Sequence, residues 1–230
     1  MILSLSALKE ERQVLRKTFG LKPSGTLSGI ELDTCPGWAH LCFGMGAERL
    51  ERALELGLKT FSPRLLLLTG FSVGLSSDLR VGDCFCDLQS SEDILTSLRE
   101  FKSVPFSFAK TYECGFLSSS NEKKAFAEKH PQAQLADLET DRFFEIVHHG
   151  VPVLVIRVVS DELQTDLPLK FEEFMDEKGF PDVKALAVQI LLRPSLLPKL
   201  VKLGRDAGLA GSRLADSLVF LKPLLSRYQN

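Results

Sequence analysis

The chain has 230 residues, with 28 Lys and Arg residues against 30 Asp and Glu residues, so its formal net charge at pH 7 is -2. A nucleic-acid-binding protein that depends on bulk positive charge is therefore not expected. Hydrophobic residues make up 44% of the chain and charged residues 25%, which are values of a globular protein and exclude a disordered one. We expect a single domain over residues 1–230.

The cysteines and the N-terminus indicate a protein of a reducing compartment. No Cys-x-x-Cys pair occurs, and no second Cys or His pair lies at zinc-ligand spacing, so we predict free thiols and neither a metal nor a cofactor. The apolar N-terminal stretch ends after five residues, which is too short for a signal peptide. No uncharged stretch approaches the ~20 residues of a membrane span, and we expect a cytoplasmic protein. The cysteines are Cys35, Cys42, Cys84, Cys86 and Cys114.

Short apolar runs alternate with helical patterns, which predicts an α/β layered fold. The predicted strands span residues 1–7, 38–43, 64–69, 81–87 and 151–159. The predicted helices span residues 9–19, 91–101, 121–129 and 139–149, with another after residue 46 and a mostly helical segment from residue 169 onward. Four consecutive leucines in the third strand predict that both of its faces are covered. Gly57 is the predicted C-cap of the helix that carries Leu50 and Leu54.

The histidines have structural interpretations. His40 lies on a predicted buried strand, where we expect a core residue with satisfied hydrogen bonds. His148 and His149 lie at a predicted helix end, where capping of the last carbonyl groups is the expected role. None of these positions predicts catalysis.

Polar residues at the carboxyl ends of the predicted strands form the candidate site, because ligands of open α/β sheets bind beyond those ends. They are Glu11, Gly44-Met45-Gly46, Thr69-Gly70-Phe71-Ser72, the segment 157–161 and Glu139. Each carboxylate also has a structural interpretation. Asp161 is a helix N-cap or a general acid, Glu139 is a first-turn helix carboxylate or a ligand, and Glu11 is a solvated helix residue or a catalytic one.

The Gly44-Met45-Gly46 loop is a weak signal by itself. A dinucleotide-binding fingerprint needs a third glycine where Arg49 stands and an acidic residue about 20 positions later, and neither is present. The loop is either a tight turn into a helix or a backbone segment that approaches a sugar or phosphate.

Five motifs, in the same order along the chain, carry a family resemblance. The most specific is Val151-Pro152 followed by Arg157-Val158-Val159-Ser160-Asp161, which is similar to a Val-Pro…Arg-x-x-Ser-Asp pattern. The others are Ala7-Leu8-Lys9-Glu10-Glu11, Gly44-Met45-Gly46-Ala47, Thr69-Gly70-Phe71-Ser72-Val73-Gly74-Leu75 with Val81-Gly82-Asp83, and Ala136-Asp137-Leu138-Glu139. The chain thus resembles the nucleoside phosphorylase and nucleosidase superfamily, in particular methylthioadenosine/S-adenosylhomocysteine nucleosidases. The resemblance implies a three-layer fold, a mixed β-sheet flanked by helices.

The resemblance also assigns roles to residues. The implied catalytic residues are Asp161, Glu11, Arg157 and Ser160, and the implied substrate contacts are Glu139, Leu138, Gly46, Gly44, Phe71 and Ser72. Asp161, oriented by Ser160, would protonate the departing purine at N7. Glu11 would deprotonate a water that Arg157 helps to hold, and Glu139 would bind the ribose hydroxyl groups. The chemistry suits these residue types, because the sugar gains positive charge while the base leaves with negative charge.

Leu68 favours water over phosphate as the nucleophile. Phosphorylases of the superfamily carry an Arg just before the glycine turn, and this chain has Leu68 there, which offers phosphate no donor. We therefore predict a nucleosidase that releases the base, with adenine expected, from a 5′-substituted purine nucleoside. Phosphorolysis is the first alternative. A diverged nucleoside-binding protein is the second, because Phe71, the helix face 141–144 and the short 115–124 loop depart from the family pattern.

The C-terminal segment narrows the resemblance to one branch of the superfamily. Asp166-Leu167-Pro168, Gly179 and the leucines that follow Arg193-Pro194 resemble the hopanoid-associated branch, which implies cleavage of adenine from an adenosyl hopane precursor. Leucines at helical spacing from Leu191 to Leu203 predict inward packing rather than membrane contact, although they could flank an apolar 5′ group. The resemblance further implies a homodimer or larger homo-oligomer.

Overall fold

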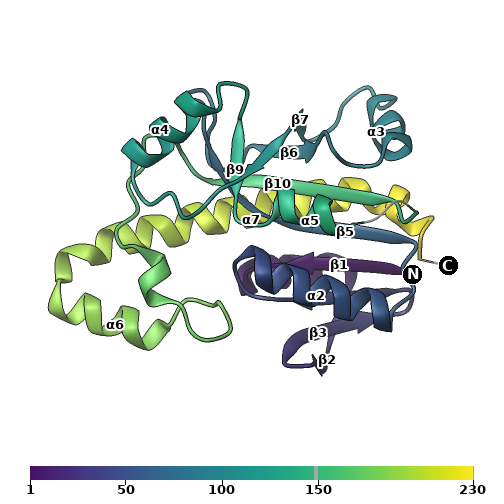
Figure 1. The fold of residues 1–230 in the computed structure, drawn as a ribbon, viewed down its shortest axis with the longest axis horizontal. Helices are drawn as coiled ribbons and strands as arrows, with labels where there is room; N and C mark the ends of the chain where they lie inside the picture. Colours follow the sequence, from purple (N-terminus) through teal and green to yellow (C-terminus); the bar gives the residue numbers. More distant parts are fainter. Residues whose placement is uncertain (148–149, 230) are drawn as a thin grey trace.

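The computed structural model describes residues 1–147 and 150–229, so the predicted roles of His148 and His149 lie outside it. Across these residues, ten strands form one mixed sheet flanked by helices, as predicted (Figure 1). The strands are β1 (Ile2–Ser6), β2 (Lys22–Leu27), β3 (Ile30–Cys35), β4 (Trp38–Cys42), β5 (Leu65–Gly74), β6 (Cys84–Asp87), β7 (Ser107–Ala109), β8 (Thr111–Glu113), β9 (Leu135–Asp137) and β10 (Val153–Asp161). That one domain spans the chain stays a prediction.

The strand order is β2-β3-β4-β1-β5-β10-β6-β7, with β9 paired to both β5 and β8. The central strands β4, β1, β5 and β10 are parallel to one another. Their carboxyl ends therefore lie on the same edge of the sheet, where the sequence places its candidate residues. The hairpin of β2 and β3 escaped prediction, because most of its side chains are exposed or half-buried and give no hydrophobic pattern.

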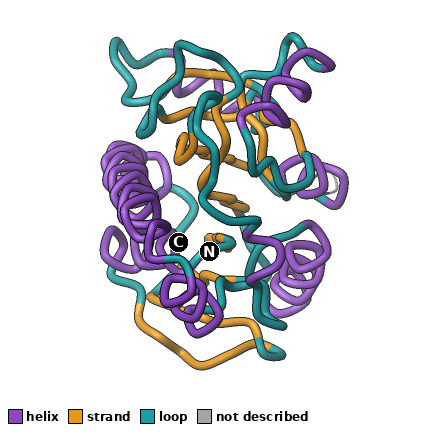
Figure 2. The backbone as a smooth tube through the Cα atoms, turned by 90° about the vertical axis from the view of Figure 1, so that its left-hand side faces the viewer, coloured by secondary structure: helices purple, strands orange, loops and turns teal. Residues whose placement is uncertain are grey.

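Helices cover both faces of the sheet, and Figure 2 shows the strands between them. The α-helices are α1 (Lys9–Phe19), α2 (Ala47–Thr60), α3 (Glu92–Arg99), α4 (Ser120–Lys129), α5 (Thr140–Ile146), α6 (Val183–Leu192) and α7 (Leu197–Ser226), with short 3₁₀ turns at Phe171–Phe174 and Pro194–Leu196. Helices α1, α3 and α7 pack on one face, whereas α2 and α5 pack on the other. Although α7 is 30 residues long, no helix among the described residues is both long and apolar enough to cross a membrane.

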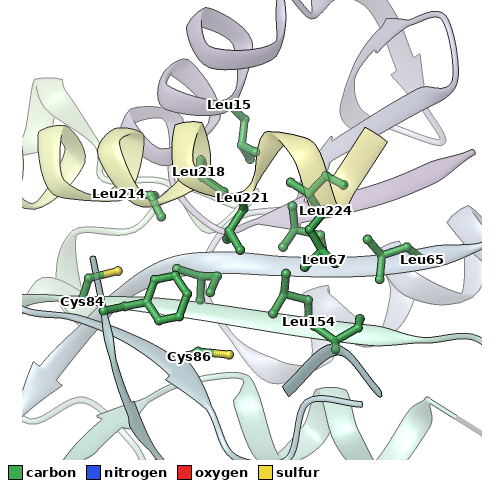
Figure 3. Packing of buried hydrophobic residues seen from close by; sticks show 14 of the residues in the cluster. Leu15, Leu65, Leu67, Cys84, Cys86, Leu154, Leu214, Leu218, Leu221 and Leu224 are labelled. Atoms are coloured by element: carbon green, nitrogen blue, oxygen red, sulfur yellow. The ribbon is translucent and has the colours of Figure 1, made fainter. Parts of the chain in front are cut away.

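The four leucines of β5 alternate between the two cores, because successive side chains of a strand point to opposite faces. Leu65 and Leu67 pack with the leucines of α7, as Figure 3 shows, while Leu66 and Leu68 pack with α2 and α5. All four are fully buried. The prediction that both faces of this strand are covered is confirmed.

Gly57 lies inside α2 and does not end it, so the predicted C-cap is wrong. A Cβ atom at this position would lie 2.6 Å from Leu3 Cδ2 and 3.2 Å from Leu41 Cδ1. The glycine therefore allows α2 to approach the sheet closely. Similarly, Gly204 and Gly211 lie within α7 rather than interrupting it.

His40 is a core residue with satisfied hydrogen bonds, as predicted. Its Nδ1 lies 3.0 Å from Ser4 Oγ and its Nε2 lies 3.3 Å from Ser6 Oγ on the neighbouring strand β1. Burial lowers the pKa of His40 to about 3, so the ring is neutral at physiological pH.

The C-terminal leucines correct the prediction of inward packing. Leu191 is 80% exposed, Leu192 70% and Leu197 50%. Helix α6 projects from the body of the molecule instead of lying on the sheet, so one side of it faces outward (Figure 1). Leu200 and Leu203 lie further along the chain and contribute to the wall of a cavity. The leucine run is thus divided between surface and cavity.

Candidate active site

A cavity of about 390 Å³ lies beyond the carboxyl ends of the parallel strands, a size that fits small-molecule sites. Among the residues that the resemblance implicated, seven line this cavity: Glu11, Phe71, Ser72, Leu138, Glu139, Ser160 and Asp161. They come from parts of the chain up to 150 positions apart and are brought together by α1, β5, β10 and the segment that follows β9. Arg157, Gly44 and Gly46 lie behind this wall.

Glu11 is 2% exposed and is not a solvated helix residue. Its Oε2 accepts the backbone N–H groups of Ala7 and Leu8 at 2.9 Å each, and its Oε1 accepts that of Phe71 at 2.8 Å. Burial raises the pKa of Glu11 to about 7, although these N–H groups and the charge of Arg157 act in the opposite direction. A carboxyl group with this pKa changes between acid and base forms near neutral pH.

Arg157 is 2% exposed and supplies the positive charge behind the carboxylates. Its Nη2 forms an ion pair with Asp137 Oδ2 and also hydrogen-bonds Thr140 Oγ1 at 2.8 Å. A Cβ atom at position 70 would lie 2.5 Å from Arg157 Nη1 and 3.0 Å from Glu11 Oε1. The backbone of Gly70 therefore passes close beside both groups, and only glycine leaves room for them.

Glu139 faces the cavity from the N-terminal end of α5. Its Oε1 accepts the backbone N–H of Gly46 at 2.9 Å, and its Oε2 lies 4.0 Å from Arg157 Nη2. Glu139 occupies the N-cap position of α5, but its side chain accepts no hydrogen bond from the first turn of this helix. Burial and then the charge of Asp137 raise the pKa of Glu139 to about 8.

Asp161 is the last residue of β10, and no helix starts after it, so its interpretation as an N-cap is wrong. Its Oδ2 forms an ion pair with Lys123, which is fully buried in α4. Its Oδ1 is buried without a hydrogen-bond partner within the described residues. Burial raises the pKa of Asp161, while the hydrogen bond and charge of Lys123 act in the opposite direction.

Two serines, Ser72 and Ser160, also line the cavity. Ser160 Oγ is 3.5 Å from the carbonyl oxygen of Ser72, at the limit of a weak hydrogen bond. Ser72 Oγ is buried and has no partner within the described residues. A buried hydroxyl group without a partner costs free energy, so it is available to a bound molecule.

The two loop glycines have structural roles, and it is Met45 between them that lines the cavity. Gly44 has a φ of 82°, and a Cβ atom there would overlap the carbonyl oxygen of Lys178. Met45 N–H bonds the carbonyl oxygen of Gly179 at 2.9 Å. The loop is therefore clamped to the turn at residues 176–180, and the approach of its glycine backbone to a sugar stays a prediction.

The departures from the family pattern in α5 do not alter the cavity. Arg142 pairs with Glu51 and Glu145, and Asp141 accepts the backbone N–H of Glu113. Phe143 is buried in the core beside α2. Residues 141–144 are absent from the cavity lining, whereas Cys114 and residues 115–117 of the short loop are part of it.

Sequence reasoning missed three residues of the site, which are Asp137, Thr140 and Lys123. Asp137 accepts the backbone N–H of Thr140 at 2.9 Å and a hydrogen bond from its hydroxyl group, and together they fix Arg157. Lys123 was part of a charged run that predicts a solvated helix face. The sequence feature that indicates its burial is its spacing to Phe126 and Ala127, three and four positions later. This spacing places all three residues on the inward face of α4.

The cavity carries acidic groups without a lining cation. Among the described residues that line it, there are five carboxylates and no Lys, Arg or His. Nor do the described residues contain a group of three or more His, Cys, Asp or Glu side chains arranged to hold a metal ion. The C-terminal third of the chain contributes an apolar wall to the cavity, with Leu167, Phe171, Pro181, Leu186, Leu200 and Leu203.

No family model matches the chain, but its fold is that of known nucleosidases. A Borrelia burgdorferi protein assigned as a 5′-methylthioadenosine/S-adenosylhomocysteine nucleosidase, with adenine bound, aligns with a TM-score of 0.69 at 12% identity over 97% of this chain and 100% of its own. The Neisseria meningitidis nucleosidase in complex with methylthio-immucillin-A gives 0.63 at 16% identity over 96% and 99%. The Arabidopsis thaliana 5′-methylthioadenosine nucleosidase gives 0.64 at 13% identity over 96% and 95%. The predicted nucleoside phosphorylase-like fold is confirmed.

Proposed function

We propose that this protein is a nucleosidase that hydrolyses the N-glycosidic bond of a 5′-substituted purine nucleoside, with adenine as the expected base. One observation carries the proposal. Glu11, Glu139 and Asp161, far apart in the sequence, face one cavity whose described lining has no cation. The shared fold with nucleosidases that bind adenine or methylthio-immucillin-A supports it.

Asp161 is the proposed acid of the base end. As the bond between C1′ and N9 breaks, its electron pair goes to the purine, and protonated Asp161 donates its proton to N7. The free Oδ1 in the cavity wall is the atom suited to this contact. Positioned acid catalysis of this kind contributes about 10²–10⁴-fold to a rate.

Glu11 is the proposed base of the opposite end. It takes a proton from the attacking water, whose oxygen bonds to C1′, and its pKa of about 7 suits that transfer at neutral pH. The free Ser72 hydroxyl group provides a hydrogen-bond partner for this water. Arg157 stabilises the ionised form of Glu11, because its charge lowers that pKa.

Glu139 is the proposed ribose ligand. Its carboxyl group is held by the N–H of Gly46 and lies in the cavity wall beside Leu138. A carboxylate can accept both hydroxyl groups of a ribose, and its negative charge stabilises the positive charge that the sugar gains. Hydrogen bonds from the ribose hydroxyl groups and the positive charge on the sugar both favour the ionised form of Glu139, so this group loses its proton when the substrate binds.

Water rather than phosphate is the proposed nucleophile. Five carboxylates and no cation line the cavity within the described residues, so a phosphate dianion would meet like charge and no counter-charge in the lining. Leu68, where a phosphate-binding Arg is expected in a phosphorylase, is fully buried in the apolar core. Phosphorolysis remains the alternative for the experiment to exclude.

The apolar wall favours a nucleoside whose 5′ substituent is itself apolar. Leu186, Leu200 and Leu203 belong to the apolar part of the cavity lining. A methylthio group and the larger hopane group that the resemblance implies are both members of this class, and the apolar contact area scales with the size of the group.

A homodimer in the cytoplasm is the proposed state of the protein. Several outward side chains of α6 are apolar and exposed, with Val183 75% and Leu191 80% exposed, and exposed apolar side chains of this kind are typical of interfaces. The five cysteines are all free, which supports a reducing compartment. Light scattering coupled to size-exclusion chromatography tests the dimer, and a monomeric mass at micromolar concentration would contradict it.

The test of function is a chromatographic screen for free base. Adenosine, methylthioadenosine, S-adenosylhomocysteine and inosine are each incubated with the protein, with and without phosphate. We expect base and free ribose product independent of phosphate, fastest for methylthioadenosine, and no base release by Asp161→Asn. Ribose 1-phosphate formed in proportion to added phosphate would establish phosphorolysis instead. Adenine binding without turnover would establish a binding protein.

A further inference from the structure

Lys123 is an unusual residue for the interior of a protein, because it is fully buried and charged. It lies on the inward face of α4, and its ammonium group has three N–H donors. One is directed to Asp161 Oδ2, one to the carbonyl oxygen of Glu162 at 3.1 Å and one to that of Thr165 at 2.6 Å. All three donors are thus satisfied, which is what a buried ammonium group requires to stay charged.

The pair leaves Asp161 with two different oxygens. Oδ2 is held by Lys123, whereas Oδ1 is buried in the cavity wall with no partner within the described residues. We propose that Lys123 is the positioning residue of the base end: it holds Oδ2 and leaves Oδ1 as the one carboxylate atom that meets the base. The inference rests on the proposed function, and it names a residue that the sequence motifs do not contain.

Lys123 also affects when Asp161 carries a proton. From α4, its charge and hydrogen bond oppose the effect of burial on the pKa of Asp161. From α7, Lys202 acts in the same direction as Lys123 and Asp206 in the opposite one. Removal of Lys123 therefore raises this pKa, and the alkaline limb of the pH–rate profile, where an acid loses its proton, moves to higher pH.

Lys123→Met tests the proposal, with Lys124→Met as the matched control. Lys124 is the next residue of the same helix and is exposed, so the control removes the same charge without touching Asp161. With methylthioadenosine as substrate, we expect Lys123→Met to lower kcat about 10-fold at its optimal pH and to move the alkaline limb upward by at least one pH unit. Lys124→Met should keep both values within twofold of the wild type. Equal profiles for the two variants would overturn the proposal.

A second readout shows whether Lys123 acts through Asp161. Adenine affinity, measured by isothermal titration calorimetry, should fall about 10-fold in Lys123→Met. In the Asp161→Asn background, the same substitution should change adenine affinity less than twofold, because the group that Lys123 positions has gone. Equal losses in both backgrounds would mean that Lys123 only supports the fold, and the proposal would fail.

Two further outcomes separate this proposal from the proposed function. If Lys123→Met does not fold, Lys123→Gln retains neutral N–H donors and should show the same shift of the alkaline limb. If the wild type releases no base from any nucleoside, the proposed function fails, while the adenine titrations still decide whether Lys123 positions Asp161. If the wild type binds no adenine either, both proposals fail.

Discussion

The two ends of the cavity bury negative charge in different ways. At the proposed sugar end, Glu11, Glu139 and Asp137 lie around one buried cation, Arg157. At the proposed base end, Asp161 pairs with Lys123. Burial raises the pKa of Glu11 to about 7 and that of Glu139 to about 8, and it also raises the pKa of Asp161, against the hydrogen bond and charge of Lys123.

This difference teaches how one cavity can contain several carboxyl groups with separate tasks. Carboxyl groups that outnumber their cation hold protons at neutral pH, and a bound ligand can release them. A carboxyl group with a cation of its own is held in a fixed orientation, and the cation opposes part of the rise in pKa that burial causes. The expected outcomes below test this contrast, from the largest effect to the smallest.

The largest expected effect is that of Glu11→Gln on catalysis. The amide cannot take a proton from water, so kcat for methylthioadenosine should fall about 10²–10⁴-fold. In the wild type, kcat/KM should rise about tenfold per pH unit up to about pH 7, where Glu11 becomes ionised, and then level off. Glu55→Gln, on the exposed side of α2, is the control and should match the wild type. Wild-type turnover by Glu11→Gln would remove the sugar-end base from the mechanism.

Arg157→Met should give the largest loss of stability. It leaves Asp137 and Glu139 buried without their counter-charge, and breaking a buried pair costs about 3–5 kcal/mol. Urea denaturation followed by circular dichroism measures the unfolding free energy. The control is Arg142→Met, which also removes two ion pairs, but these are partly exposed and solvent weakens them, so only a small loss is expected. Similar losses for both variants would contradict the role of Arg157 as the shared cation.

Glu139→Gln should change how stability depends on pH. The folded pKa of Glu139, about 8, lies above its ordinary value of 4.5, so the folded protein retains a proton that the unfolded chain releases between these values. The contribution is fully present below pH 4.5 and is lost as pH rises towards 8. From pH 6.5 to 8, the wild type should lose up to about 1.4 kcal/mol per pH unit from this group, and the variant should lack that part of the slope.

The titration of His40 limits the pH range of this measurement. The lowered pKa of His40 gives stability that is lost as pH falls from 6.5 towards 3, so the wild-type slope is clearest above pH 6.5. Glu122→Gln is the control, because hydrogen bonds from Ser119 and Ser118 lower the pKa of Glu122, which then titrates below this range. Identical slopes for the wild type and Glu139→Gln would show that Glu139 carries no proton in the folded protein.

The smallest expected effect lies at the apolar wall. Leu200→Ala removes a side chain from the cavity and should lower kcat/KM for methylthioadenosine about 10-fold, and for adenosine, which lacks the methylthio group, by less. Leu191→Ala removes the same atoms from an exposed position and should leave both values unchanged. Equal effects on the two nucleosides would place the 5′ group elsewhere.

Much of the fold follows from the sequence where burial gives a clear pattern. Helix α1 has the predicted bounds, and the leucines of β5 indicate a strand covered on both faces. The hairpin of β2 and β3 and the short strands β7, β8 and β9 give little such pattern. Gly57 shows the same limit of sequence-based prediction. A glycine in a helical pattern indicates either a helix end or a close approach of the helix to its neighbour, and only the contact with Leu3 in the structure shows that it is the second.

The candidate site divides in the same way. Residues at strand ends could be predicted, because the parallel strands must bring Glu11 and Asp161 to one edge of the sheet. Lys123 could not, since a lysine in a charged run predicts a solvated face and only tertiary packing reveals its burial. Leu191 and Leu203 have similar patterns in the sequence, yet one is exposed and the other lines the cavity.

The clamp at Gly44 has a mechanical consequence. The N–H group of Gly46 donates a hydrogen bond to Glu139. Gly44 and Met45, in the same loop, contact the turn at residues 176–180, which precedes α6. A displacement of α6 would therefore move the loop backbone at residues 44–46. The N–H group of Gly46 in this loop holds the carboxyl group of Glu139 in the cavity wall. The contact that would transmit this displacement lies at Gly44, a residue without a side chain, while α6 itself extends away from the body of the molecule.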